Sequence, residues 1–312
     1  MPEWLIERGI GETRSALIDH GEIIEARIEL HSVSRSGSVI GARLTQAAKR
    51  NAVARDEAGT EYLLPRGASS ATEGAALNIE ITRETIPGNE PWKRPLARAT
   101  DAAVCEAKPL AARAVSGNEL GKAGWDDLIE EARTGVVRFS GGELRIEPTS
   151  AMTLIDVDGH LAPDELALLG AAQAAKAIRR LDIGGSIGID LPTAGSKVAR
   201  QRAAETIDAE LPQPLERTAV NGFGFVQIVR PRQRASLIEL AQDRASFEAR
   251  ALLRRVAFEP AGPKRLVAHP ALVAVVETEP AWLDALSRQV GGSVGLRVDP
   301  ALPMSGGYAE QA

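Results

Sequence analysis

Cysteine and histidine are scarce in this chain of 312 residues, and their scarcity limits the chemistry that the chain can carry. Cys105 is the single thiol, which excludes a disulfide framework and a cysteine-based zinc site. The four histidines are scattered, so a site rich in histidine and cysteine ligands is not expected. Any bound metal would therefore be held by carboxylates, which are the ligands that a hard ion such as Mg²⁺ prefers.

Long hydrophobic runs are also missing. No apolar stretch reaches the roughly 18 residues of a membrane span, and the opening "MPEWLIERGIGETR" lacks the cationic and apolar regions of a signal peptide. We therefore expect a cytoplasmic protein with no membrane partner. The formal net charge is −5, from 37 basic and 42 acidic residues, which excludes a strongly basic nucleic-acid coat but leaves room for a local basic groove.

The first third of the chain has the pattern of short strands. Two runs, 15–19 and 23–30, flank the turn His20-Gly21-Glu22 and predict a hairpin. Further short strand candidates between 32 and 98 are separated by Gly, Asp, Ser and Pro at close intervals, which is typical of a small barrel. The segment 87–124 contains four prolines and mixed charge, and we expect it to be a connector.

The pattern changes after the connector. A short helix is predicted over 124–134, and a hairpin is predicted across Ser140-Gly141-Gly142. The strand "AMTLIDVD", ending at Gly159, is followed by a helix and by a second strand, "SIGID". One face of that helix is apolar or small: Leu166, Gly170, Ala174, Ala177, Ile178 and Leu181. This βαβ unit predicts two parallel strands joined by a right-handed crossover.

The rest of the sequence predicts a helix over 195–210, a strand in "FGFVQIVRPR", and mostly helical structure from about 235. We therefore expect a mixed α/β fold: a β region with a reduced oligonucleotide-binding barrel, a connector, a metal-dependent catalytic domain and a small C-terminal α+β domain. Their expected bounds are 1–98, 99–124, 125–234 and 235–312.

Both strands of the βαβ unit end in a carboxylate, Asp156 and Asp190. Ligands bind beyond the carboxyl ends of strands in open α/β sheets, so these two aspartates could share one divalent ion. Asp158 lies two residues after Asp156, and in a strand both side chains point to the same face. The alternative from spacing alone is that these aspartates cap turns or the following helix.

Three ordered blocks around these aspartates resemble the catalytic core of the ribonuclease E/G family: "EPTSAMTLIDVDG", "LGAAQAAKAIRRLDIGGSIGIDLP" and "ERTAVNGFGFVQIVRPR". The opening "ETRSALIDHGEIIEARIE" and the closing "GLRVDPALP" resemble the family's N-terminal strands and terminal small domain. The resemblance implies endonucleolytic cleavage of single-stranded RNA, with Mg²⁺ held by Asp156 and Asp190 and with Asp158 beside them in the catalytic site.

The sequence departs from the family pattern at several positions. Asp158 stands where the family has Asn, and Thr193 stands where the family has a second acid. Two stacking phenylalanines of the family's barrel are replaced by Val53 and Leu63, and Tyr62 or Trp92 could take their place, although packing roles are favoured for both. The connector leaves no room for the family's sensor of the RNA 5′ end. The cysteines of its zinc link are absent, so a zinc-bridged dimer is not expected.

Basic residues supply candidates for RNA binding. One group borders the expected barrel, and another follows Asp190 and the third strand, where it could hold phosphates near the metal. The candidates are Arg83, Lys93, Arg94, Arg98, Arg200, Arg202, Arg230 and Arg232. Three functions remain open: an Mg²⁺-dependent endoribonuclease, a catalytically degenerate RNA-binding or ribosome-associated protein, and a metal-dependent phosphodiesterase acting on a small nucleotide.

Overall fold

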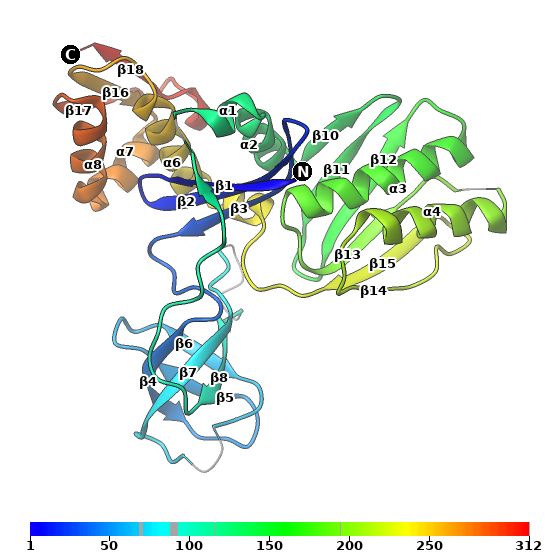
Figure 1. Cartoon of the computed structure of the whole chain (residues 1–312), viewed down its shortest axis with the longest axis horizontal. Coiled ribbons are helices and arrows are strands. Elements are labelled where there is room, and N and C mark those ends of the chain that lie inside the picture. Colours follow the sequence, from blue (N-terminus) through cyan, green and yellow to red (C-terminus); the bar gives the residue numbers. More distant parts are fainter. Residues whose placement is uncertain (69–70, 88–92, 116, 194, 312) are drawn as a thin grey trace.

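The structure is a computed structural model that describes residues 1–68, 71–87, 93–115, 117–193 and 195–311. A central N-terminal sheet is flanked by a barrel below it, by a larger sheet with helices to its right, and by a C-terminal unit to its upper left (Figure 1). The expected mixed α/β fold with an N-terminal barrel is confirmed.

The N-terminal sheet has the order β3-β2-β1-β9. Its strands are β1 (Glu3–Arg8), β2 (Glu12–Asp19), β3 (Glu22–Leu30) and β9 (Arg113–Ala114). The predicted hairpin joins β2 to β3. His20 and Gly21 both have positive φ, 49° and 86°, which is the backbone of the tight two-residue turn that suits twisted antiparallel strands.

The barrel is closed in the order β4-β5-β6-β8-β7. Its strands are β4 (Val39–Gln46), β5 (Ala52–Arg55), β6 (Glu61–Leu64), β7 (Ala76–Arg83) and β8 (Leu96–Thr100). Leu44, Leu64 and Ile79 fill its interior. Strand β8 falls inside the segment 87–124 that the prolines had suggested to be a connector, and this prediction is wrong at that point. Closure requires β8, because it pairs with both β6 and β7.

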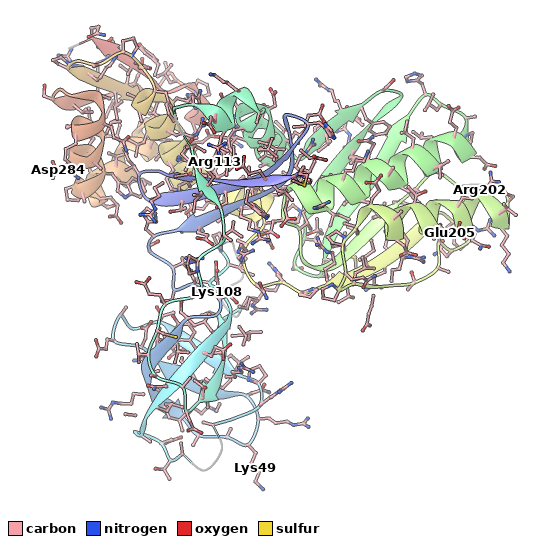
Figure 2. The ribbon with its side chains drawn as sticks, viewed as in Figure 1. Lys49, Lys108, Arg113, Arg202, Glu205 and Asp284 are labelled. Atoms are coloured by element: carbon pink, nitrogen blue, oxygen red, sulfur yellow. The ribbon has the colours of Figure 1, made fainter. Side chains whose placement is uncertain are left out.

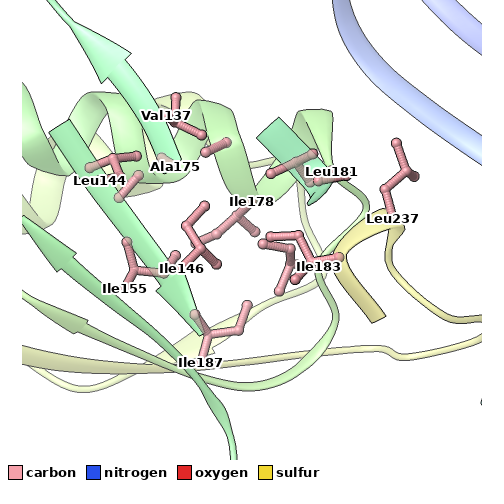
Figure 3. Packing of buried hydrophobic residues seen from close by; sticks show 14 of the residues in the cluster. Val137, Leu144, Ile146, Ile155, Ala175, Ile178, Leu181, Ile183, Ile187 and Leu237 are labelled. Atoms are coloured by element: carbon pink, nitrogen blue, oxygen red, sulfur yellow. The ribbon is translucent and has the colours of Figure 1, made fainter. Parts of the chain in front are cut away.

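The larger sheet has the order β10-β11-β12-β13-β15-β14. Its strands are β10 (Val136–Phe139), β11 (Gly142–Pro148), β12 (Thr153–Gly159), β13 (Gly185–Asp190), β14 (Glu216–Arg217) and β15 (Phe225–Arg230). Helix α3 (Pro163–Arg180) connects β12 to β13 and packs against α4 (Lys197–Glu210). The apolar face of α3 expected from its periodicity is buried, as are Leu144, Ile155 and Ile187 of the sheet face that packs with it (Figure 3).

Alternation along β12 separates the two faces of this sheet. Ile155 and Val157 are buried in the core, whereas Leu154, Asp156 and Asp158 are exposed on the opposite face. Successive side chains of a strand point to opposite faces, so the carboxylates lie on the open face and the helices lie on the other.

The C-terminal unit contains a three-stranded sheet, β17-β16-β18, packed with helices. Its elements are α6 (Arg244–Ala257), β16 (Lys264–Ala268), α7 (Pro270–Thr278), α8 (Pro280–Val290), β17 (Val294–Val298), the 3₁₀ turn η1 (Met304–Gly306) and β18 (Tyr308–Gln311). The helices α1 (Glu119–Lys122), α2 (Trp125–Thr134) and α5 (Leu237–Gln242) complete the fold. In the described residues, no helix is both long and apolar enough to span a membrane.

Buried ion pairs join the C-terminal unit to the N-terminal sheet. Arg250 and Arg254 of α6 contact Glu12 and Glu7 at 2.7 and 3.0 Å, and Arg14 contacts the same two carboxylates at 2.6 and 2.7 Å. Burial pushes the pKa of Glu12 up, but Arg14 and Arg250 outweigh burial and hold that pKa below its usual value. Removing one partner would leave an unpaired buried charge, so these pairs fix how the two parts meet.

Candidate functional site

Asp156 and Asp190 lie directly opposite each other on neighbouring strands. Strands β12 and β13 are parallel, and Asp156 is the register partner of Asp190. Adjacent strands are about 4.8 Å apart, and both residues are exposed. The predicted parallel adjacency of these strands is therefore confirmed. The crossover through α3 brings the two carboxylates together from positions 34 residues apart in the sequence.

The pair belongs to a longer row that runs across four strands. Arg145 of β11 is the register partner of Asp156, and Phe225 of β15 is the register partner of Asp190. Register partners place their side chains on the same face. The row therefore presents, in order, the cation Arg145, the carboxylates Asp156 and Asp190, and the aromatic ring of Phe225, over about 14 Å.

Glycine leaves room for Phe225 to lie over the sheet. A Cβ atom at Gly188 would come within 2.6 Å of the Phe225 ring and 3.1 Å of Leu154. Phe225 and Leu154 thus cover Gly188 and form an apolar surface next to Asp190. The sequence reasoning did not identify Arg145 or Phe225 as site residues. The alternation in "ELRIEP" and "FVQIV" carries the signal for their face, but the pairing of strands was needed to bring them to the aspartates.

Asp158 lies one step further along the same face. Its register partner is Glu143, which is 2.6 Å from Arg145 and 3.9 Å from Arg138. The register partner of the extra acid is thus itself an acid, whose charge is offset by these two arginines. His160, considered as a proton donor, is an exposed residue after the end of β12, and its backbone N–H donates to the carbonyl of Gly141. Thr193, at the position of the missing acid, donates through Oγ1 to the carbonyl of Phe223.

The electrostatics of the row favour a cation. The pKa of Asp156 lies above its usual value, first because the carboxyl is partly desolvated and then because Asp158 and Asp190 are negatively charged nearby; Arg145 opposes this shift. A cation placed between the aspartates would relieve their repulsion. Within the part of the chain that the structure describes, three or more acidic, histidine or cysteine side chains do not gather closely enough for a metal site. A site of two carboxylates completed by water fits Mg²⁺, which usually keeps several waters.

The basic residues of the barrel are engaged in contacts within the chain. Arg94 contacts Glu61 at 3.1 Å and Arg98 contacts Glu80 at 2.6 Å. Arg83 donates to the carbonyl of Arg94. Lys93 donates to the carbonyl of Ser150, between β11 and β12, and so links the barrel to the larger sheet. Arg83, Arg94 and Arg98 are therefore held by groups of the barrel itself.

The other basic candidates lie on different elements from the aspartates. Arg200 and Arg202 belong to α4, in the helical layer on the other face of the sheet, and Figure 2 shows Arg202 at the right-hand end of the molecule; their role near the metal stays a prediction. Strand β15 is antiparallel to β13, so Arg230 is the register partner of Gly185, at the opposite end from Asp190. The expectation that Arg230 and Arg232 lie near Asp190 is wrong by about 16 Å, because β15 runs antiparallel to β13 and ends at the other end of the sheet.

The barrel positions where the family has phenylalanine are occupied by a cross-strand pair. Val53 is buried and its register partner Leu63 is half-buried. Tyr62 is buried in the barrel core and donates to Asp56, so its predicted packing role is confirmed. Trp92 lies outside the described residues.

Comparisons with known proteins give a partial similarity. Ribonuclease G from Escherichia coli (strain K12) is 34% identical over 110 residues, and the proteins named Ribonuclease G from Salmonella typhimurium and Haemophilus influenzae are 33% and 36% identical over the same length. In each case the match covers 31% of this chain and 22% of the relative. No protein-family profile matches the chain. The chain is therefore similar in part to proteins named Ribonuclease G, and the match spans about a fifth of their length.

Proposed function

We propose that this protein is an Mg²⁺-dependent endoribonuclease that hydrolyses phosphodiester bonds in single-stranded RNA. The observation that carries the proposal is the pairing of Asp156 with Asp190 on the open face of the larger sheet. The partial similarity to Ribonuclease G supports an RNA substrate.

Each residue of the row across the sheet has a different role in the proposed reaction. Asp156 and Asp190 would hold Mg²⁺, which supplies positive charge and lowers the pKa of a bound water. Asp158 accepts a hydrogen bond from water in the same site. Arg145 donates to a phosphate oxygen of the substrate, and its charge also opposes the repulsion among the acids. Phe225 offers an aromatic face to a nucleobase beside the scissile phosphate.

The proposed domain roles follow from this row. The barrel strands within 1–98 would bind the single strand, residues 99–124 would connect, residues 125–234 would carry the catalytic site, and residues 235–312 would support the N-terminal sheet. Arg83, Lys93, Arg94 and Arg98 would guide the RNA backbone past the barrel, and Arg200 and Arg202 would contact it beyond the sheet. We propose that the protein works in the cytoplasm, where its substrate is found, and without a zinc-bridged dimer.

The direct test is cleavage of a 5′-labelled single-stranded RNA by the purified full chain, with Mg²⁺ or with EDTA. We expect internal cuts in Mg²⁺ and none in EDTA. Asp284→Asn is a suitable control variant, because Asp284 is exposed on α8 at the opposite end of the molecule (Figure 2). If preparations free of other nucleases never cut RNA, the proposal is wrong.

A second candidate is an RNA-binding protein of the same fold that has lost catalysis. The observations that favour it are Thr193 in place of an acid and the pair Val53 and Leu63 in place of aromatic residues. It predicts RNA binding that is unaffected by EDTA, with no cleavage under any metal.

A further inference from the structure

A pocket lined by arginines lies at the end of the larger sheet opposite the aspartates. It is a cavity of about 370 Å³ between β3, the loop before β13, the segment after α4 and the linker that follows β15. Figure 1 shows this linker leaving the sheet after β15 and crossing to the centre of the molecule. Four arginines and two carboxylates line it: Arg27, Arg230, Arg232, Arg234, Glu25 and Asp182. The lining therefore carries an excess of positive charge.

Among the four arginines of the pocket, Arg230 is the one that has no ion-pair partner in the described residues. Among the described residues, no carboxylate lies within ion-pair distance of its guanidinium, and its Nη1 donates to the carbonyl of Ile183 at 3.0 Å. The Nε atoms of all four arginines are buried without a hydrogen-bond partner in the protein. Burial lowers the pKa of Arg230, which reflects the cost of keeping this charge away from water.

Neighbouring groups hold the other arginines in place around Arg230. Arg234 contacts Asp182 at 3.2 Å, and Arg232 is paired with Glu239. Arg27 contacts Glu25 at 2.6 Å and lies over the Trp4 ring. Each side chain is therefore ordered in advance, which lowers the entropy cost of binding a ligand.

Two glycines before and at the start of β13 allow the linker after β15 to pack closely against them. A Cβ atom at Gly184 would lie 2.7 Å from the carbonyl oxygen of Pro231, and one at Gly185 would lie 3.2 Å from Cδ of Arg232. Gly185 has φ +83°, a conformation that side chains disfavour. The two glycines let the linker press against the start of β13, which keeps Arg230 and Arg232 beside the cavity.

We propose that this pocket binds a phosphate group, with Arg230 as its main contact. The planar guanidinium donates two parallel hydrogen bonds to phosphate oxygens, and a pocket with excess positive charge favours an anion over a neutral ligand. The site is separated from Asp190 by the length of β13, about 16 Å, and it does not depend on the proposed cleavage reaction. The phosphate comes either from a small molecule or from a nucleic-acid backbone.

The test is titration calorimetry of the full chain with inorganic phosphate at constant ionic strength. We expect binding to the unmodified protein, at least tenfold weaker binding to Arg230→Gln, and a smaller loss in Arg230→Lys, which keeps the charge. Arg288→Gln removes an exposed arginine of α8 and should leave binding unchanged. Thermal unfolding of each variant without phosphate identifies any that fails to fold, and Arg27→Gln then serves as the second pocket variant.

A second titration uses an oligouridylate that has hydroxyl groups at both ends. If the unmodified protein and Arg230→Gln bind the oligonucleotide with equal affinity, the pocket is assigned to small phosphates. If Arg230→Gln weakens oligonucleotide binding about as much as it weakens phosphate binding, and phosphate displaces the oligonucleotide, the pocket is assigned to the RNA backbone. Absence of binding of inorganic phosphate, or equal affinity for inorganic phosphate in Arg230→Gln and the unmodified protein, overturns the proposal.

Discussion

The two ends of strand β13 differ in charge and in exposure. At its carboxyl end, Asp190 stands beside Asp156 on an open face, and negative charge collects there. At its amino end, Gly185 is paired with Arg230, and positive charge collects in a recessed pocket. The direction of the neighbouring strands causes this separation: parallel β12 brings its acid to the same end as Asp190, whereas antiparallel β15 carries its arginines to the other. The two groups of opposite charge are thereby kept about 16 Å apart, the length of β13.

The largest effect is expected from substitution of the two aspartates, Asp156 and Asp190. Asp156→Asn and Asp190→Asn should each reduce Mg²⁺-dependent RNA cleavage by about 10²–10³-fold, because each removes one of two ligand charges, worth several kcal/mol in the transition state. The double variant should lose little more, since both substitutions disable one unit. Cleavage rates at saturating RNA measure this. Full activity in both single variants would remove the metal assignment.

A smaller effect concerns the aromatic residue beside Asp190. Phe225→Leu should weaken binding of single-stranded RNA about tenfold, because stacking on a base contributes about 1–3 kcal/mol. Val229→Ala is the matched control, since Val229 is exposed on the same strand nearer its other end. Fluorescence anisotropy with a labelled oligonucleotide measures both. Equal losses in the two variants would mean that the open face contributes no specific contact at Phe225.

Asp182, which lies in the arginine pocket, should make the free energy of unfolding depend on pH. The pKa of Asp182 is raised by burial, against the pull of Arg234 and Arg27. The Asp182 carboxyl therefore keeps its proton to a higher pH in the folded state than in the unfolded chain. The stabilisation from this bound proton is fully present below the pKa of Asp182 in the unfolded chain, and it is lost as the pH rises through the pKa of Asp182 in the folded state. Asp182→Asn removes this dependence and tolerates the positive φ of 54°.

Relative to the unmodified protein, Asp182→Asn should thus gain stability as the pH rises above about 4, the pKa of an aspartate in an unfolded chain. Urea unfolding at several pH values measures the difference, with Asp284→Asn as the exposed control. A difference that stays constant over this range would contradict the raised pKa.

The smallest effect is expected at Asp158. Asp158→Asn replaces an exposed acid by the residue of the resembling family, and its neighbours Glu143 and Arg145 remain paired with each other. We expect cleavage within about threefold of the unmodified protein, the usual range for a surface change of about 0.5 kcal/mol. A loss as large as that of Asp156→Asn would make Asp158 a ligand rather than a neighbour.

Local sequence patterns determined much of this protein. The turn at His20-Gly21, the buried face of α3 and the alternation along β12 all follow from periods of 2 and 3.6 residues and from turn chemistry, which depend on near neighbours in the chain. The βαβ connection then required parallel strands, and this was enough to predict that Asp156 and Asp190 would meet.

Only the tertiary structure decided what surrounds them. Strand β8 belongs to the barrel although the segment around it is rich in proline, because closure needs a partner for both β6 and β7. Arg145 and Phe225 lie beside the aspartates and Arg230 lies away from them, because strand pairing and strand direction are set by contacts between distant segments. A local pattern fixes which face a side chain occupies, but it carries no information about which strand lies beside it or which way that strand runs.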